Sequence, residues 1–148
     1  MDNISKEEIK QYVVFKLGNE EYGIDIHQVQ IIEKIKKITR VPKAPAHIKG
    51  VINLRGEIIP VMSLKSKFGL GEDQYTDETR IIIVKIDDNQ IGMIVDEVKE
   101  VLQISSNSIE NVQQGDINLN FIQGVGKVNQ QIVTILNLRT LIEFVKDV

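Results

Sequence analysis

The sequence has no cysteine, no tryptophan and no long apolar run, and each of these absences excludes a class of protein. Without cysteine there is no disulfide framework, no thiol nucleophile and no cysteine-based zinc site. No stretch approaches the roughly 18 apolar residues of a membrane-spanning helix. The start, MDNISKEEIK, is polar and does not match a secretory signal. We therefore expect a cytoplasmic protein that does not insert into a membrane.

Motifs that carry catalysis are also missing. The two histidines, His27 and His47, show neither metal-ligand spacing nor a nucleophile motif. The segment Gly124–Lys127 lacks the spacing and the hydroxyl residue of a phosphate-binding loop. We therefore expect no enzymatic activity, no metal and no cofactor.

Charge is distributed unevenly along the chain. Residues 34–67 carry nine lysines and arginines and one acid, whereas residues 69–120 carry eleven acids and three bases. A basic segment on a small barrel allows nucleic-acid binding as an alternative. Against it, the net charge is −3 and aromatic residues are few. Most aromatic residues lie in the apolar pattern, which predicts core positions rather than stacking platforms, so we expect no nucleic-acid partner. These residues are Tyr12, Phe15, Tyr22, Phe68 and Phe144.

The chain repeats itself with one short insertion. Shifting Tyr12–Leu17 (YVVFKL) by 69 positions gives Ile81–Ile86 (IIIVKI), and only the lysine is polar in either run. After five extra residues in the second copy, an offset of 74 aligns Ile58–Leu64 with Ile132–Leu138. Several segments aligned in the same order predict an internal duplication, with repeats over about residues 12–68 and 81–145.

Each copy predicts the same short elements. An apolar strand, a turn and a second strand precede apolar residues at helical spacing. A hairpin and a capped helical turn follow, with Ser63 and Asn137 as the capping residues. Short strands with regular turn signals are typical of small barrels, so we predict a mainly β fold of two five-stranded barrels with short helices, including a C-terminal one. The residues at helical spacing are Ile26, Val29 and Ile32 in the first copy and Val95, Val98 and Leu102 in the second.

Two residues are expected to shape the strands. Gly23 lies inside the second strand, where a glycine suggests a bulge or a tight bend. Pro60 has no backbone N–H, so its strand is expected to be an edge strand or to be bulged there.

The segment His47–Leu70, HIKGVINLRGEIIPVMSLKSKFGL, resembles the signature of the CheW family of bacterial chemotaxis coupling proteins. Gly18–Ile26, GNEEYGIDI, resembles a second family segment, and the likeness extends over residues 10–145. The resemblance implies one CheW-like domain of two intertwined SH3-like barrels after a flexible N-terminus, residues 1–9. It also implies a non-enzymatic adaptor that joins the regulatory domain of the histidine kinase CheA to chemoreceptor hairpin tips in membrane receptor arrays.

The resemblance further implies a receptor-binding site. Arg55 corresponds to the arginine of the family's Arg-Gly turn, which is implicated in receptor contact. Val29 and Ile31 belong to the segment that lines the receptor-binding side. The residues that bind the kinase are not predicted. The remaining residues of the motif around the arginine are Gly50, Asn53, Leu54 and Gly56.

Two positions depart from the family pattern. Family members often have an acid where this chain has Ile31, which places in doubt a salt bridge at that position. They often have aspartate where this chain has Ser63, and both residue types cap helices. Two other hypotheses stay open at this point, namely a nucleic-acid-binding barrel that uses residues 34–67 and an enzyme of unrecognised type.

Overall fold

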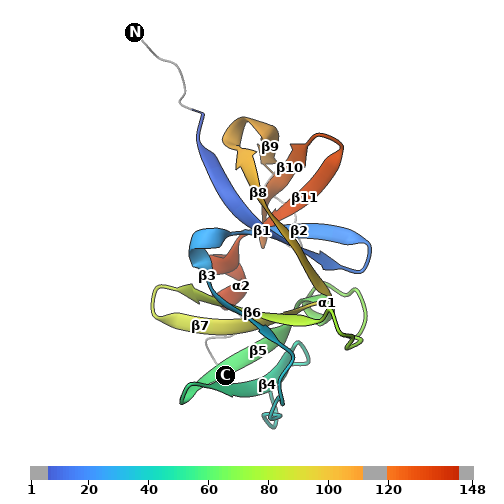
Figure 1. The fold of residues 1–148 in the computed structure, drawn as a ribbon. Coiled ribbons are helices and arrows are strands. Elements are labelled where there is room, and N and C mark those ends of the chain that lie inside the picture. The colour runs from blue at the N-terminus through green and yellow to red at the C-terminus, as the bar shows by residue number, and fades with distance from the viewer. Residues whose placement is uncertain (1–6, 112–119, 144–148) are drawn as a thin grey trace.

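The computed structural model describes residues 7–111 and 120–143, which form two twisted β-sheets and short helices (Figure 1). The first sheet contains β1 (Ile9–Leu17), β2 (Glu20–Asp25), β8 (Glu97–Ser105), β9 (Ile109–Asn111), β10 (Ile122–Val128) and β11 (Gln131–Leu136). The second sheet contains β3 (Val29–Lys34), β4 (Ile48–Leu54), β5 (Glu57–Ser63), β6 (Arg80–Ile86) and β7 (Asn89–Val95). The helices are the 3₁₀ turns η1 (Ile26–Gln28) and η2 (Ser106–Ser108) and the α-helices α1 (Leu64–Lys67) and α2 (Leu138–Glu143). This mainly β class, with a C-terminal helix, confirms the predicted fold class.

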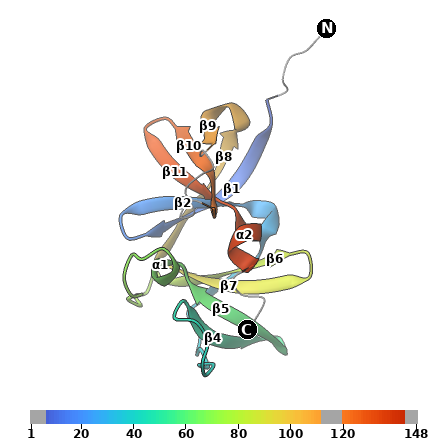
Figure 2. The ribbon, with the colours of Figure 1, turned by 180° about the vertical axis from the view of Figure 1, so that it is seen from behind.

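Each sheet combines strands from both halves of the sequence. The first sheet, barrel A, has the order β8-β1-β2-β11-β10-β9, and the second, barrel B, has the order β3-β6-β7-β5-β4. The first two strands of each half therefore join the last strands of the other half, as the alternating colours in Figures 1 and 2 show. Barrel A has six strands where five were expected, because the short strand β9 adds to its edge.

The pairing registers of the two halves coincide at the offsets found in the sequence. Tyr12 pairs with Asp25 in β1–β2, and the offset of 69 leads to the pair Ile81 and Ile94 in β6–β7. The parallel contacts that join the halves are equivalent too, since Val61 pairs with Gly92 and Ile135 pairs with Gly23. The internal duplication thus appears as an internal twofold relationship between barrels A and B.

Three apolar clusters explain the continuous apolar runs of the sequence. One cluster lies within each barrel, and a larger central cluster lies between the two sheets. In β1, Tyr12 and Val14 enter the cluster of barrel A, whereas Val13 and Phe15 enter the central cluster. A strand buried on both faces is apolar at successive positions, which accounts for YVVF here and for IIIV in β6.

Both α-helices begin at the predicted caps. The Ser63 hydroxyl oxygen accepts a hydrogen bond from the N–H of Ser66 at 3.1 Å, and the Asn137 side-chain oxygen accepts one from the N–H of Thr140 at 3.3 Å. The helical spacing predicted before each hairpin is largely wrong. Of the residues at helical spacing only Ile26 lies in a helical turn, η1, whereas Val29 and Val98 lie in strands. Apolar residues on both faces of these strands imitate a helical pattern.

Gly23 does not sit at a bulge, contrary to the expectation. The β1–β2 register is continuous there, and a Cβ on Gly23 would lie 2.9 Å from a methyl group of Val133. The glycine therefore permits a close approach of β11, which joins the two halves. Pro60 does not lie on an edge strand, because its strand β5 is internal to the sheet. The alternative, a bulge, occurs next to it on the partner strand, where the β4–β5 register shifts between Ile48 and Gly50. The pairing of β5 with β7 begins only at Val61, so the missing N–H precedes that ladder.

Candidate partner-binding surface

Four tight hairpins connect paired strands, and each places at least one residue in the left-handed backbone region. The residues at three of these turns are Gly18, Asp87 and Asn129, which tolerate positive φ. The fourth turn has Arg55, at φ 54°, an arginine that gains no such compensation. Arg55 is exposed at the end of the β4–β5 hairpin, so its guanidinium group is presented to solvent on a strained turn.

The neighbours of Arg55 fix this turn. The side-chain oxygen of Asn53 accepts a hydrogen bond from the N–H of Gly56 at 3.2 Å, and Gly56 itself has φ 84°. Leu54 is only 8% exposed and belongs to the cluster of barrel B, so its side chain anchors the hairpin in the core. The residues of the motif thus have three roles: Arg55 is exposed, Asn53 stabilises the turn by a hydrogen bond, and Leu54 is buried.

Val29 and Ile31 both lie on β3, but they pack against different clusters. A register shift between them turns the two side chains to opposite faces of the sheet, because Val29 pairs with Val84 and Ile31 pairs with Ile83. Val29 packs against the central cluster at the seam between the barrels, whereas Ile31 packs against the cluster of barrel B, which also contains Leu54. Ile31 and the base of the Arg55 hairpin therefore pack in the same cluster, that of barrel B, whereas Val29 lies between the two barrels.

Gly50, on β4 of the same hairpin, packs closely against the loop that contains Thr39. Its φ is 144°, and a Cβ there would lie 2.1 Å from the carbonyl oxygen of Thr39. Thr39 and Val51 exchange two backbone hydrogen bonds of 2.8 Å, which hold the preceding loop against β4. Gly50 is therefore needed for the close packing of this loop.

Two pairs of exposed apolar side chains occupy equivalent positions in the two halves of the chain, and the sequence did not predict their exposure. Ile32 on β3 is 42% exposed and its counterpart Val101 on β8 is 49% exposed. Ile58 on β5 and its counterpart Ile132 on β11 are 63% and 58% exposed. Both β3 and β8 cross the face turned to the viewer in Figure 1. The offsets of 69 and 74 align these pairs in the sequence, but only the structure shows that they are exposed.

The two histidines lie in different environments. His27 is exposed and lies 3.1 Å from a carboxylate oxygen of Asp25, and burial lowers the pKa of His47. Over residues 7–111 and 120–143 no group of three or more His, Asp or Glu side chains gathers as a metal site would require. Tyr12, Phe15 and Tyr22 are buried as predicted, Phe68 is only partly buried, and Phe144 lies outside the described residues.

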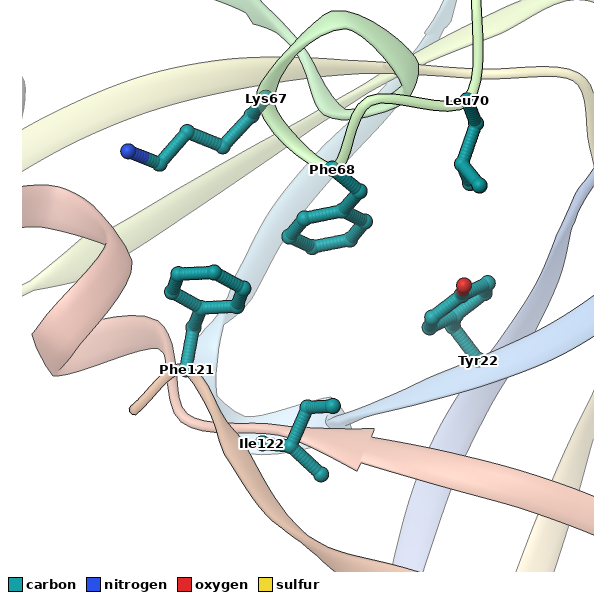
Figure 3. Close-up of a pocket in the computed structure, with 6 residues that line it drawn as sticks. All are labelled: Tyr22, Lys67, Phe68, Leu70, Phe121 and Ile122. Atoms are coloured by element: carbon teal, nitrogen blue, oxygen red, sulfur yellow. The ribbon is translucent and has the colours of Figure 1, made fainter. Parts of the chain in front are cut away.

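A pocket of about 260 Å³ opens beside α1 (Figure 3). Three rings form a stacked series in it, with centroid distances of 5.8 Å between Tyr22 and Phe68 and 5.2 Å between Phe68 and Phe121. The Lys67 ammonium lies 5.7 Å from the centroid of the Phe121 ring. Figure 3 shows Ile122 opposite Phe68 and Leu70 at the rim. This pocket has walls from both halves of the sequence.

These features define a module that binds other proteins: two small barrels, exposed apolar positions and a presented arginine. In the part of the chain that is described, no helix is long and apolar enough to cross a membrane. The family model for the CheW-like domain matches residues 11–146. The chain is 37% identical over 140 residues to the chemotaxis protein CheW of Helicobacter pylori, covering 93% of this chain and 84% of that protein.

Two further relatives agree. The CheW chemotaxis protein of Bacillus subtilis is 43% identical over 106 residues, covering 72% of this chain and 68% of that protein. The crystal structure of the scaffolding protein TtCheW from Thermoanaerobacter tengcongensis has a TM-score of 0.81 and 42% identity, and the match covers 87% of this chain and 89% of that one. The chain belongs to the CheW-like family. It is a chemotaxis scaffold that links receptors and CheA, and it is not an enzyme.

Proposed function

We propose that the chain couples the cytoplasmic hairpin tip of a chemoreceptor to the regulatory domain of CheA, in the cytoplasm at membrane receptor arrays. The receptor contacts Arg55 at the end of the β4–β5 hairpin and the β3 segment that contains Val29 and Ile31. Asn53 and Gly56 hold the turn, and Leu54 anchors it in barrel B. As one CheW-like domain over residues 10–145, the chain provides separate surfaces for its two partners and does not insert into the membrane.

The observation that carries this proposal is the left-handed conformation of Arg55. The equivalent turns in the same fold have glycine, aspartate or asparagine, so the hairpin itself does not require an arginine. A side chain held in an unfavourable backbone conformation points to a function that depends on it. The side chain is exposed, so this function is contact with a partner.

The chemistry of the surface suits a helical partner. Arginine presents a rigid fork of donors that fits a carboxylate or the free carbonyl groups of a helix end. The seam beside β3 adds apolar contact, because Ile26, Val29 and Val98 are only partly buried against the central cluster. An amphipathic receptor helix laid on this surface would use the helix-in-groove mode of recognition.

The experiment is a calorimetric titration with a purified cytoplasmic fragment of a receptor from the same cell. We expect Arg55→Asn to weaken binding about tenfold or more, since truncating a central arginine contact has an effect of this size. Arg139→Asn is the matched control, because Arg139 is another exposed arginine, 66% exposed, and lies on α2. Binding of Arg55→Asn with the affinity of the unsubstituted chain would remove Arg55 from the site.

A second titration, with the regulatory domain of CheA, shows whether Arg55→Asn affects only the receptor-binding surface or the whole chain. Arg55→Asn is expected to bind the regulatory domain of CheA as the unsubstituted chain does, because the two partners use separate surfaces. A loss of both interactions would show instead that the substitution disturbs the whole chain.

A further inference from the structure

The first three residues of β1 pair with a neighbouring strand on one side only. Residues 9–11 pair with residues 103–105 of β8, whereas the pairing of β1 with β2 begins at Tyr12, opposite Asp25. After Asp25 the chain leaves the sheet in the turn η1. The edge of β1 before Tyr12 is therefore open, and in Figures 1 and 2 no labelled strand lies along its outer side.

The equivalent strand of the other half has no such edge. The strand β6 begins at Arg80, the counterpart of Gln11, and Arg80 pairs both with Val95 of β7 and with Lys34 of β3. The counterpart of Val95 is Ile26, which lies in η1 and not in β2. The open edge is thus a property of barrel A and not a general consequence of the fold.

The backbone groups of Ile9 are turned toward the open edge. In an antiparallel ladder, successive residues direct their N–H and C=O groups alternately to the two sides of the strand. The carbonyl oxygen of Glu8 accepts a hydrogen bond from the N–H of Ser106 at 2.8 Å, so Glu8 is turned toward β8. Ile9 therefore presents one donor and one acceptor on the other side, where another strand can pair with them.

Space for another strand lies beside this edge. A hollow of about 530 Å³ has Ile9, Gln11, Asp25 and His27 among its lining residues. Ile9, a large apolar residue, is 60% exposed there. A strand added to the edge would cover the Ile9 side chain and bond to the outward backbone groups, as in recognition by strand addition.

The charges of the edge identify the strand that fits it. If a second copy of β1 pairs antiparallel with the first and the two Ile9 residues lie opposite each other, each Glu8 lies opposite the partner's Lys10. Residues 8 and 10 share one face of the strand, so two ion pairs form on that face and the two Ile9 side chains meet on the other.

The side chains of Glu8 and Lys10 are available for these pairs. Glu8 is exposed and Lys10 is partly exposed, and within residues 7–111 and 120–143 neither takes part in an ion pair. Charged side chains on a strand edge usually oppose pairing with other chains. Here the order of the acid and the base makes the edge complementary to itself, which favours a second copy of the chain as the occupant.

We propose that two copies of the chain associate through the open edges of β1, antiparallel around a twofold axis at Ile9, so that the two barrel A sheets become continuous. A twofold contact of this kind closes on itself and gives a dimer, not a filament. The β4–β5 hairpin lies at the other end of the molecule in Figures 1 and 2, so each copy keeps Arg55 free. The contact is small, and we expect a weak dimer that forms at high concentration of the chain.

The test is analytical ultracentrifugation of the full chain at rising concentration, up to about 1 mM. We expect the unsubstituted chain to form a dimer in this range. Lys10→Glu and Glu8→Lys each place two pairs of like charges opposite each other, so each variant alone is expected to associate about tenfold more weakly. In an equal mixture every lysine of one variant meets an acid of the other, and the mixture is expected to dimerise about as strongly as the unsubstituted chain.

Two further variants complete the test. Ile9→Pro removes the outward N–H without removing a bond to β8, and we expect this variant to stay monomeric. Lys85→Glu is the matched control, because Lys85 is exposed on β6 and the change in charge equals that of Lys10→Glu. It is expected to dimerise as the unsubstituted chain does, and thermal unfolding of every variant checks that it is folded.

Three results would overturn the inference: an unsubstituted chain that stays monomeric, dimers that persist in both charge variants, or a mixture of these variants that does not associate. If one charge variant does not fold, Ile9→Pro and the other charge variant decide the outcome. The inference does not depend on the proposed function, which the receptor titration of Arg55→Asn tests separately.

Discussion

The side-chain oxygen of Asn53 accepts a hydrogen bond from the backbone N–H of Gly56 at 3.2 Å, across the turn that presents Arg55. The two residues of the turn, Arg55 and Gly56, both have positive φ, at 54° and 84°. A short polar side chain that bonds to the backbone stabilises such a turn locally. The conformation of the turn that presents Arg55 is therefore stabilised by the side chain of Asn53.

Asn53→Ala removes this bond. We expect a loss of about 0.5–1 kcal/mol in the free energy of unfolding, the usual net contribution of one hydrogen bond. Weaker receptor binding is expected as well, because Arg55 would be less well oriented. Asn53→Asp keeps an oxygen acceptor and should restore both quantities, measured by urea unfolding and receptor titration. Failure of Asn53→Asp to restore either would show that the amide group has another role.

Exchanging the residues of two equivalent turns tests the strain at Arg55. Arg55→Asn is expected to raise the free energy of unfolding by about 1 kcal/mol, because asparagine tolerates the left-handed region better than arginine. Asn129→Arg, at the equivalent turn of barrel A, is expected to lower it by a similar amount. Urea unfolding of both variants gives the two values. Equal stabilities would mean that Arg55 is not strained.

Gly50→Ala should be among the most damaging substitutions of a small residue. Its Cβ would meet the Thr39 carbonyl oxygen at 2.1 Å, so the loop paired with β4 must move. We expect a loss of about 3 kcal/mol or more, or failure to fold. Gly56→Ala is the comparison, since nothing lies within 4 Å of its Cβ position and only the backbone conformation resists it, at about 1 kcal/mol. Similar losses in the two variants would contradict this account.

An ion pair in barrel A predicts a dependence of stability on pH. Hydrogen bonds from Lys99, at 2.8 Å, and from Gln131 lower the pKa of Glu21 below its usual 4.5. The ionised Glu21 side chain therefore contributes to the free energy of unfolding, and this contribution is complete above about pH 4.5. It is lost as the pH falls through the lower pKa that Glu21 has in the folded state. We expect Glu21→Gln to be less stable than the unsubstituted chain at about pH 7, with a smaller difference at about pH 3.

The matched control uses the equivalent neutral pair of barrel B. Gln90 donates to Gln30 at 2.7 Å, where barrel A has Glu21 and Lys99. The effect of Gln90→Ala on the free energy of unfolding should be the same at both pH values, because neither side chain titrates. A pH-independent effect of Glu21→Gln would exclude the ion pair as the cause.

Much of the fold could be predicted from the sequence because the apolar residues of the two halves recur at constant offsets of 69 and 74. The runs at Tyr12–Leu17 and Ile81–Ile86, the turns and both helix caps follow from local chemistry and are confirmed. The role of Gly23 did not follow, because its reason is the approach of Val133 from the other half of the chain. The helical pattern misled for a related reason, since it came from strands that contact two clusters.

The candidate surface was predictable only in part. The motif located Arg55 on a hairpin turn, but the sequence did not show that Leu54 is buried or that Ile32 and Val101 are exposed. Exposure depends on which face of each strand meets another sheet, and this requires the pairing of the two halves. The α1 pocket was missed for the same reason, because its aromatic residues lie far apart in the sequence and two of them, Tyr22 and Phe68, were expected to be core.

The most direct test of the adaptor role is recruitment of CheA to receptor-containing membranes, measured by sedimentation with and without this chain. We expect the unsubstituted chain to bring the kinase down with the membranes, and Arg55→Asn to leave it in the supernatant while still binding CheA in solution. Recruitment by Arg55→Asn equal to that by the unsubstituted chain would contradict the account, because the presented arginine would then have no part in joining the receptor to the kinase.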